Sequence, residues 1–107
     1  MHVISRRALT NFWATHADAK SPLEAWFKAV SNGTFANLVE LKQTFGSVDY
    51  VPIDYTKAGK RLRREFHVFN IGGNRYRLVT AIHFNTQRCF IRFVMTHSEY
   101  DRGDWRK

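Results

Sequence analysis

The sequence predicts an α+β domain in which two to three helices come first and pack on one face of an antiparallel sheet of about four strands. Residues 5–45 carry apolar side chains at helical spacing, residues 47–55 change to an extended pattern, and residues 65–96 alternate apolar and polar side chains around two turns. Helices followed by a run of strands are typical of this class. A short strand at Met1–Ile4 is also expected, and residues 1–107 have the length of a single domain.

Three stretches in the first half of the chain have the start and stop signals of helices. Ser5 is a candidate N-cap for the first helix. Ser21-Pro22-Leu23-Glu24 predicts a capping box at the start of the second, and Asn32-Gly33 predicts its end because these residues tolerate a positive φ. Asn37 repeats the cap for a shorter third helix, which runs through Phe45.

A tight turn at Gly72-Gly73 joins two predicted strands, Glu65–Ile71 and Asn74–Phe84. A two-residue turn makes Val68 the partner of Arg77. Since partners in a sheet project to the same side, the side chain of Arg77 is expected on the face that carries Val68.

A second turn at Thr86-Gln87 leads into the last strand and makes Ala81 the partner of Arg92. Arg77 and Arg92 would then stand on one partly open face of the sheet, among small apolar side chains. A guanidinium group in such a place can hold a phosphate through two hydrogen bonds. Structural ion pairing is the alternative interpretation of these arginines, although residues 57–107 contain only four acidic residues.

The last strand ends in a run of polar side chains, Thr96-His97-Ser98-Glu99-Tyr100-Asp101. Side chains just past a strand end are held by a rigid sheet and stay open to a ligand, which is where binding and proton-transfer groups are commonly found. A polar turn without a chemical role is the alternative interpretation.

The positive charge of the chain lies in its second half. The formal net charge is +8; residues 1–56 contain five basic and five acidic residues, whereas residues 57–107 contain twelve basic and four acidic ones. This excess predicts a polyanionic partner. Its densest part, Lys57–Arg64, is either a solubilising loop or strand edge, or a phosphate-binding arm. The candidate RNA-binding residues are Lys57, Lys60, Arg61, Arg63, Arg64 and Arg75.

Other classes of site find little support in the sequence. The single cysteine, Cys89, has no Cys or His partner at metal-ligand spacing and is interpreted as a small buried apolar residue. The carboxylates are few and scattered, so neither a metal nor a cofactor is expected. No apolar run approaches the roughly 20 residues of a membrane span, and the first residues lack the pattern of a secretion signal. A cytoplasmic protein without membrane contact is therefore expected.

Two segments, VFNIGGNRYRLV (Val68–Val79) and QRCFIRFVMTHSEYD (Gln87–Asp101), resemble the HigB-type toxins of bacterial toxin–antitoxin pairs, within the RelE-like superfamily of small mRNA-cleaving domains. The amino-terminal MHVISRRAL is similar more weakly. The stretch Asp54–Glu65 is longer and more basic than is typical of the family.

The resemblance implies an endoribonuclease toxin that cuts mRNA, often on the ribosome, and so inhibits translation. It implies silencing by a cognate HigA-like helix-turn-helix antitoxin, through which alone the toxin would meet operator DNA. It also implies site residues. Arg77 matches an arginine that contacts the reacting phosphate, and His97 and Tyr100 match a basic group followed by an aromatic residue past the last strand.

These residue types suit cleavage of RNA through its own 2′-hydroxyl, which needs a base, an acid and a cation that stabilises the transition state. A histidine ordinarily changes protonation near neutral pH, so His97 can transfer the proton. Arg77, with Arg92, supplies the cation. Tyr100 is expected to stack on a base, because an ordinary phenol is a weak acid–base catalyst at neutral pH. The alternative is a non-catalytic RNA- or ribosome-binding module.

Overall fold

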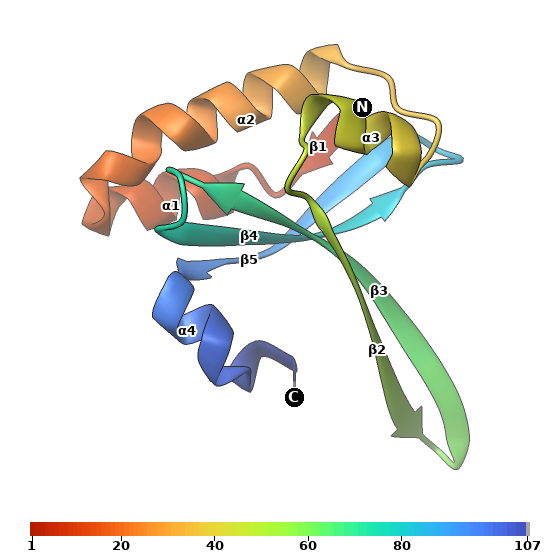
Figure 1. Ribbon diagram of the computed structural model, residues 1–107. Helices are drawn as coiled ribbons and strands as arrows, with labels where there is room; N and C mark the ends of the chain where they lie inside the picture. Colours follow the sequence, from red (N-terminus) through yellow and green to blue (C-terminus); the bar gives the residue numbers. More distant parts are fainter. Residues whose placement is uncertain (107) are drawn as a thin grey trace.

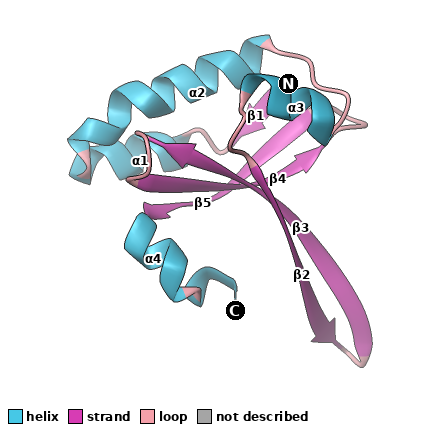
Figure 2. Cartoon of the chain, in the orientation of Figure 1, coloured by secondary structure: helices cyan, strands magenta, loops and turns pink. Residues whose placement is uncertain are grey.

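The computed structural model describes residues 1–106 as helices packed on a five-stranded mixed sheet (Figures 1 and 2). The helices are α1 (Arg7–Thr15), α2 (Lys20–Asn32), α3 (Leu38–Thr44) and α4 (His97–Arg102), with 3-10 turns at Ala17–Ala19 and Asp104–Arg106. The strands are β1 (His2–Ile4), β2 (Asp49–Lys57), β3 (Lys60–Ile71), β4 (Tyr76–His83) and β5 (Arg88–Thr96), in the order β1-β5-β4-β3-β2. No helix among these residues is long and apolar enough to cross a membrane.

The predicted α+β class is confirmed, but the sheet has five strands rather than about four and is not entirely antiparallel. The expected strand at the amino terminus forms, and it joins the sheet as β1, parallel to the first residues of β5. Strands β2 to β5 make the antiparallel part in chain order. The sheet is therefore mixed because its first strand pairs with its last.

Helices α1 to α3 lie over one face of the sheet, and α4 lies on the other side of it (Figure 1). The main core fills the space under the first three helices, where Leu9, Leu23 and Leu41 are fully buried against residues such as Leu78. Cys89 belongs to this core with no exposed surface, and burial raises the pKa of its thiol to about 12. Its predicted role as a buried apolar residue is thus confirmed.

A second, smaller core lies on the opposite face of the sheet. Its buried members are Val51, Phe66, Val68, Val79 and Met95. Tyr100 and Trp105 pack against this cluster from α4 and the 3-10 turn that follows it. This contact holds α4 to the sheet and fixes the position of the polar residues that follow β5.

The predicted caps of the first and third helices have different outcomes. Ser5 is not the N-cap of α1: it takes a positive φ of 76°, and the helix begins after Arg6. The backbone N–H of Ala8 donates to the carbonyl of Ser5, so a turn forms where the side-chain cap was expected. Asn37 does cap α3, because its Oδ1 accepts from the backbone N–H of Glu40 at 3.0 Å.

The second helix, α2, begins earlier than its predicted capping box, and it ends for a different reason from the one predicted. The 3-10 turn Ala17–Ala19 runs directly into α2 at Lys20, so Ser21 lies inside the helix and no capping box forms. The helix does end at Gly33, but with a φ of −99°. A Cβ at Gly33 would lie 2.6 Å from the ring of Phe35, so glycine is needed here for close packing.

The β3–β4 hairpin has a four-residue turn, residues 72–75, instead of the two-residue turn that was predicted. Val68 consequently pairs with Val79, and Arg77 pairs with Asn70. The predicted partners were therefore wrong by two residues. Because side chains alternate with a period of two, this shift preserves the faces, and Arg77 does lie on the same face as Val68.

The β4–β5 hairpin also has a four-residue turn, residues 84–87, and Ala81 pairs with Phe90 rather than Arg92. In addition, a β-bulge interrupts the pairing between Val79 and Thr80. Arg92 lies in this interruption without an opposite residue on β4. A bulge re-aims the side chain that it leaves unpaired, and alternation along the sequence could not predict it.

Strands β2 and β3 continue well past the end of β4 as a two-stranded ribbon, residues 53–64, which we call the arm (Figure 1). Its five residue pairs extend about 16 Å at roughly 3.3 Å per residue. Ala58 and Gly59 form its turn, both with a positive φ, as suits a tight hairpin. The basic stretch is thus a pair of exposed strands and not a loop.

Candidate active site

The beginning of α4 is fixed by a capping box between Thr96 and Glu99. The hydroxyl of Thr96 accepts from the backbone N–H of Glu99 at 3.2 Å, and the Glu99 carboxylate accepts from the backbone N–H of Thr96 at 3.0 Å. The hydrogen bonds from Thr96 hold the pKa of Glu99 below its usual range. His97 is therefore the first residue of a well-defined helix, and its own N–H donates to the carbonyl of Arg75.

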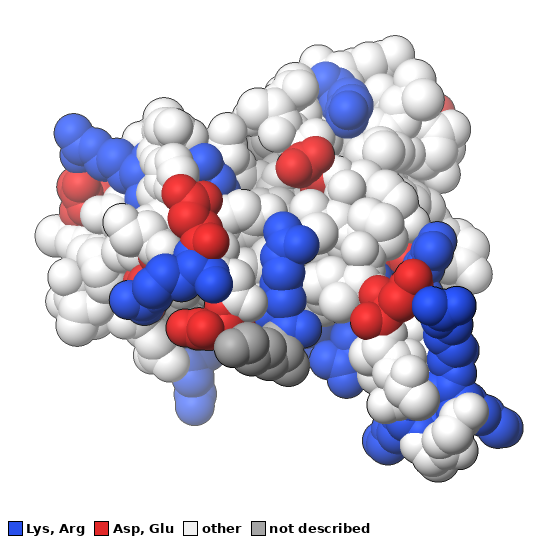
Figure 3. Space-filling model, turned by 60° about the horizontal axis from the view of Figure 1, so that its bottom comes forward, with Lys and Arg blue, Asp and Glu red and all other residues white. Residues whose placement is uncertain are grey.

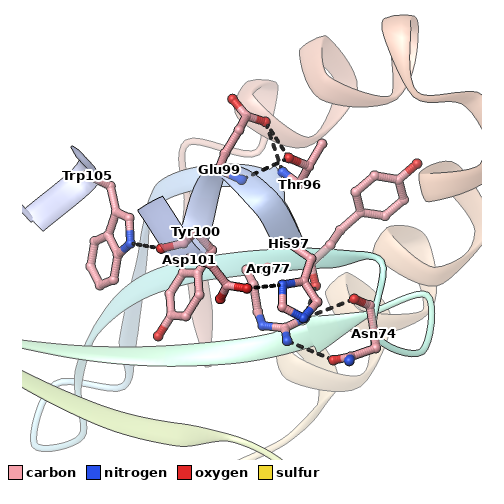
Figure 4. A network of polar contacts seen from close by, with 9 residues as sticks. Asn74, Arg77, Thr96, His97, Glu99, Tyr100, Asp101 and Trp105 are labelled. Carbon is pink, nitrogen blue, oxygen red and sulfur yellow. Dashed lines mark hydrogen bonds and ion pairs between the residues drawn. The ribbon is translucent and has the colours of Figure 1, made fainter. Parts of the chain in front are cut away.

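His97 and Asp101 form a pair on the exposed side of α4 (Figure 4). Their spacing of four residues puts them on one face of the helix, and His97 Nδ1 lies 2.8 Å from Asp101 Oδ2. This contact occupies Nδ1, so proton exchange with a ligand falls to Nε2 of the imidazole. The contact with Asp101 thus orients the imidazole, which is one requirement of a general acid or base.

Arg77 is buried, with 9% of its surface exposed, and its guanidinium group is held in one direction (Figure 4). Its Nη1 donates to the carbonyls of Asn74 and Tyr76 at 3.3 and 3.2 Å, and its Nη2 donates to Asn74 Oδ1 at 2.7 Å. All three acceptors are uncharged. They orient the guanidinium without cancelling its positive charge, which suits it for holding an anion.

Tyr100 lies between Arg77 and Trp105. Its ring stacks on Trp105 with centroids 5.1 Å apart, and the Arg77 guanidinium carbon lies 5.7 Å from the ring centre. The Trp105 indole N–H also donates to the Tyr100 carbonyl at 3.1 Å. The faces of the Tyr100 ring are therefore in contact with Trp105 and Arg77, so RNA would meet the ring at its edge and hydroxyl. Stacking of a base on Tyr100 stays a prediction, and the contacts add a role in positioning Arg77.

Arg92 and Arg75 lie apart from this group. The guanidinium of Arg92 lies 5.3 Å from the ring centre of Phe90, at the bulge of β5. Arg75 pairs with Asp18 at 2.7 Å, beside the first helices, and the hydroxyl of Tyr76 donates to the same carboxylate. These contacts, with Tyr76 contributing most, lower the pKa of Asp18. Arg75 is therefore ion-paired, whereas the hydrogen-bond acceptors of Arg77, one of the two arginines for which ion pairing was the alternative, are uncharged.

The basic residues of the arm lie at the surface, and several have neighbours on the arm itself. Arg63 pairs with Asp54 at 2.9 Å, and Arg64 lies over the ring of Tyr55 at 4.8 Å. Figure 3 views the molecule from the side of α4 and the arm, where Lys and Arg side chains gather along the arm at lower right. Their assignment to RNA binding stays a prediction.

The sequence did not reveal the contacts of three residues at this site. The sequence pattern places Asn74 in a strand, yet it lies in the turn and orients Arg77. The sequence indicates Asp101 only as a polar neighbour of His97, because the contact between their side chains requires a helix and the pattern predicts a strand exit. Trp105 carried no signal beyond its position after Tyr100. Among residues 1–106, no three His, Cys, Asp or Glu side chains are grouped to hold a metal ion.

Comparison with known proteins identifies the family. Residues 19–103 match the family described as HigB_toxin, the RelE-like toxic component of a toxin–antitoxin system. The mRNA interferase toxin HigB of Escherichia coli (strain K12) is 37% identical over 101 residues, which cover 94% of this chain and 88% of that protein. The mRNA interferase HigB of Shigella flexneri gives the same values.

A more distant relative, the mRNA interferase HigB of Escherichia coli O6:H1, is 22% identical over 102 residues, which cover 95% of this chain and 90% of that protein. The family match includes α2 to α4 and therefore both Arg77 and His97. The chain belongs to the HigB family of RelE-like toxins.

Proposed function

We propose that this protein is an mRNA-cleaving endoribonuclease that uses the RNA 2′-hydroxyl as its nucleophile and needs no metal ion. The observation that carries the proposal is the pairing of two features at one end of β4 and β5: a buried arginine with uncharged partners, and a histidine oriented by an aspartate. The relatives named mRNA interferases support mRNA as the substrate.

In the proposed reaction, Nε2 of His97 takes the proton of the 2′-hydroxyl. The 2′-oxygen attacks the adjacent phosphorus, the bond from phosphorus to the 5′-oxygen breaks, and the leaving oxygen takes a proton from water. The products are a 2′,3′-cyclic phosphate and a free 5′-hydroxyl. Asp101 accepts a hydrogen bond from Nδ1 of His97 and stabilises the imidazolium ion that forms.

Arg77 acts on the phosphate whose charge grows during this reaction. Its guanidinium is oriented before substrate binds, so little reorganisation is needed when the transition state forms. Tyr100 supports the guanidinium from one side and is itself held by Trp105. In this proposal Tyr100 positions Arg77, and the transferred proton passes through His97.

The proposed partners follow from the family. The toxin acts on mRNA, free or bound to the ribosome, and a HigA-like helix-turn-helix antitoxin silences it. An antitoxin that buries Arg77 and His97 would block the site directly. Operator DNA would be bound only through the toxin–antitoxin complex.

Product analysis tests the chemistry. Purified protein is incubated with mRNA in EDTA, and the new ends are identified. Cleavage should continue and leave 5′-hydroxyl ends, because the proposed groups are all organic. A 5′-phosphate, or loss of cleavage on chelation while the RNA stays bound, would overturn the mechanism.

Growth after induction separates an enzyme from a module that only binds RNA. His97→Ala should relieve the growth arrest caused by the wild type while the purified variant still binds RNA. His2→Ala is the matched control, because His2 is exposed on β1 and pairs with Arg88, at the opposite end of β5 from α4. If His97→Ala arrested growth as strongly as the wild type, toxicity would come from binding alone.

A further inference from the structure

The two faces of the arm differ in charge. On one face Arg63 pairs with Asp54, and the Tyr50 hydroxyl donates to Glu65 at 2.6 Å, so basic and acidic groups are matched there. We call this the acid-paired face. The strand register places on the other face Ile53, Tyr55, Lys57, Lys60, Leu62 and Arg64. This second face, the open face, has three cations and no acidic residue.

The open face of the arm continues into the face of the sheet that carries the candidate active site. The pair Val51–Phe66 follows Ile53–Arg64 along the ribbon, and Ile53 packs against the second core together with Tyr100. The cations of the open face and the guanidinium of Arg77 therefore lie on the same side of the molecule. A strand of RNA that reaches one can reach the other.

A hollow of about 780 Å³ lies where the arm leaves the sheet. Its lining includes Arg64, Phe66, Ala81, His83, Arg92 and Phe93. Ala81 has the smallest side chain of these and comes from the central strand β4, between the larger side chains of β3 and β5. A small residue at this point leaves room above the sheet.

Phe93 is the exposed aromatic residue of this hollow, with 41% of its surface open to solvent. Its partner on β4 is Val79, and the partner of Arg77 is Met95, two residues further along β5. Two residues of strand span about 7 Å. Two stacked nucleotides at about 3.4 Å each cover the same distance.

We propose that this hollow is a base-binding subsite for single-stranded RNA, beside the cleavage site. This inference rests on the proposed function, and it adds the place on the protein surface where the RNA binds. Phe93 stacks on a base, while Arg64 and Arg92 hold the flanking phosphates. An exposed aromatic ring beside cations is the pattern by which proteins bind single strands, whereas an acidic peptide would need the cations alone. The occupant is therefore RNA.

The test measures binding of a fluorescent single-stranded oligoribonucleotide with 2′-O-methyl groups throughout, which cannot be cleaved through its 2′-oxygen. Phe93→Ala should weaken binding by about tenfold, and Phe93→Trp should retain it. Val39→Ala is the control, because Val39 is an apolar residue 70% exposed on α3, outside the lining of the hollow. Ala81→Leu should also weaken binding, since it fills the hollow and removes no charge.

A charge series gives a second arm of the test. Arg64→Gln should weaken binding more than Arg61→Gln, which removes the same charge from the acid-paired face. Lys42→Gln, on the exposed side of α3, is the control and should bind as the wild type does. If Phe93→Ala lowers the stability of the fold, Phe93→Leu replaces it in the test. Leucine keeps an apolar side chain but has no aromatic ring, so a loss of RNA binding in this variant reports lost stacking.

The outcomes separate this subsite from the proposed function. If the wild type binds RNA through Phe93 but does not cleave mRNA, the proposed chemistry fails and the subsite stands. If the wild type cleaves mRNA while Phe93→Leu and Ala81→Leu bind the oligonucleotide normally, the subsite is wrong. Loss of antitoxin binding alone in these variants would show that the hollow holds a protein segment and would likewise overturn the proposal.

Discussion

Arg77 combines near-complete burial with hydrogen bonds to uncharged oxygens. Such a guanidinium should contribute more to stabilising the transition state than to the affinity for RNA. We expect Arg77→Ala to lower kcat by roughly 10²-fold, with a smaller change in affinity. Arg77→Lys should restore little, because lysine lacks the planar two-pronged contact. Single-turnover cleavage at saturating enzyme measures this; a wild-type rate for Arg77→Ala would show that Arg77 only binds.

His67 should make the stability of the fold depend on pH. It is 4% exposed, and burial lowers the pKa of its imidazole, while Glu65 partly offsets the shift. The unfolded chain takes up a proton at His67 below about pH 6.5, whereas the folded protein resists it. The free energy of unfolding should therefore fall as pH decreases below about 6.5, until pH passes the lower folded pKa.

Urea unfolding at pH 7.5 and 5.5 tests this effect of His67. In His67→Leu the difference between the two pH values should shrink, while His2→Ala, at an exposed histidine of β1, should keep the difference seen in the wild type. An unchanged pH dependence in His67→Leu would assign the effect to other groups.

At the site, the sequence indicated candidate residues whose roles stay predictions, and it did not indicate their contacts. The Arg77 guanidinium carbon lies 5.7 Å from the ring centre of Tyr100, and His97 stands on the same short helix as Tyr100. The contact between His97 and Asp101 depends on residues 97–102 forming a helix, and a six-residue helix has too few turns to show a period.

Helix α4 is short, so its cap should matter for both stability and activity. Thr96→Ala removes the hydroxyl that accepts from Glu99, and should lower the free energy of unfolding by about 1 kcal/mol. It should also lower kcat, because His97 is the first residue of the helix. Thr10→Ala, which removes an exposed hydroxyl from α1, is the control. Equal stability of both variants would mean that the second core alone holds α4.

The arm and Arg77 should affect different steps. Neutralising Lys57 and Lys60 together should raise KM. It should also flatten the dependence of binding on salt, because a protein that makes fewer phosphate contacts releases fewer counterions when it binds. It should leave kcat largely unchanged, since binding that is equal in ground and transition states does not speed the chemical step. Cleavage and RNA binding across a salt series measure both; loss of kcat with intact binding would contradict this separation.

The helices and strands were easier to predict than the register in which the strands pair. Hydrophobic patterns indicated the helices and hairpins, yet both hairpin turns have four residues where two were expected. The first error moved β4 by an even number of residues and left its faces intact. At the second hairpin the bulge after Val79 compounds the error, and it depends on packing between neighbouring strands, which alternation along one strand does not describe.

For the whole molecule, the basic arm and the site share one face, so a single antitoxin surface can cover both. The surface that contacts this face should be acidic, although buried apolar anchors will contribute more to affinity than charge does. Hydrogen exchange in a purified toxin–antitoxin complex should show protection in residues 76–102. If Arg77 and His97 stayed fully open in the complex, inhibition would have to be allosteric.

The mixed character of the sheet was the whole-molecule feature that the sequence did not predict. Residues 2–4 could be read as a strand, but their pairing with β5 joins segments at a separation that local pattern does not report. The order of helices and strands was sufficient for the fold class. The order of elements could not predict that β1 pairs in parallel with β5, since this pairing depends on how the strands come together in three dimensions.

This parallel pairing also affects the order of folding. His2 pairs with Arg88, 86 positions further along the chain, so β1 cannot enter the sheet until nearly all of the later strands have been synthesised. Contacts of such high sequence separation close large loops and slow folding. Helices α1 to α3 can form while translation continues, but the sheet is completed only when residues up to about β5 have left the ribosome. His97 and Asp101 follow β5 in the chain, so the candidate active site can be assembled only in this last stage of synthesis.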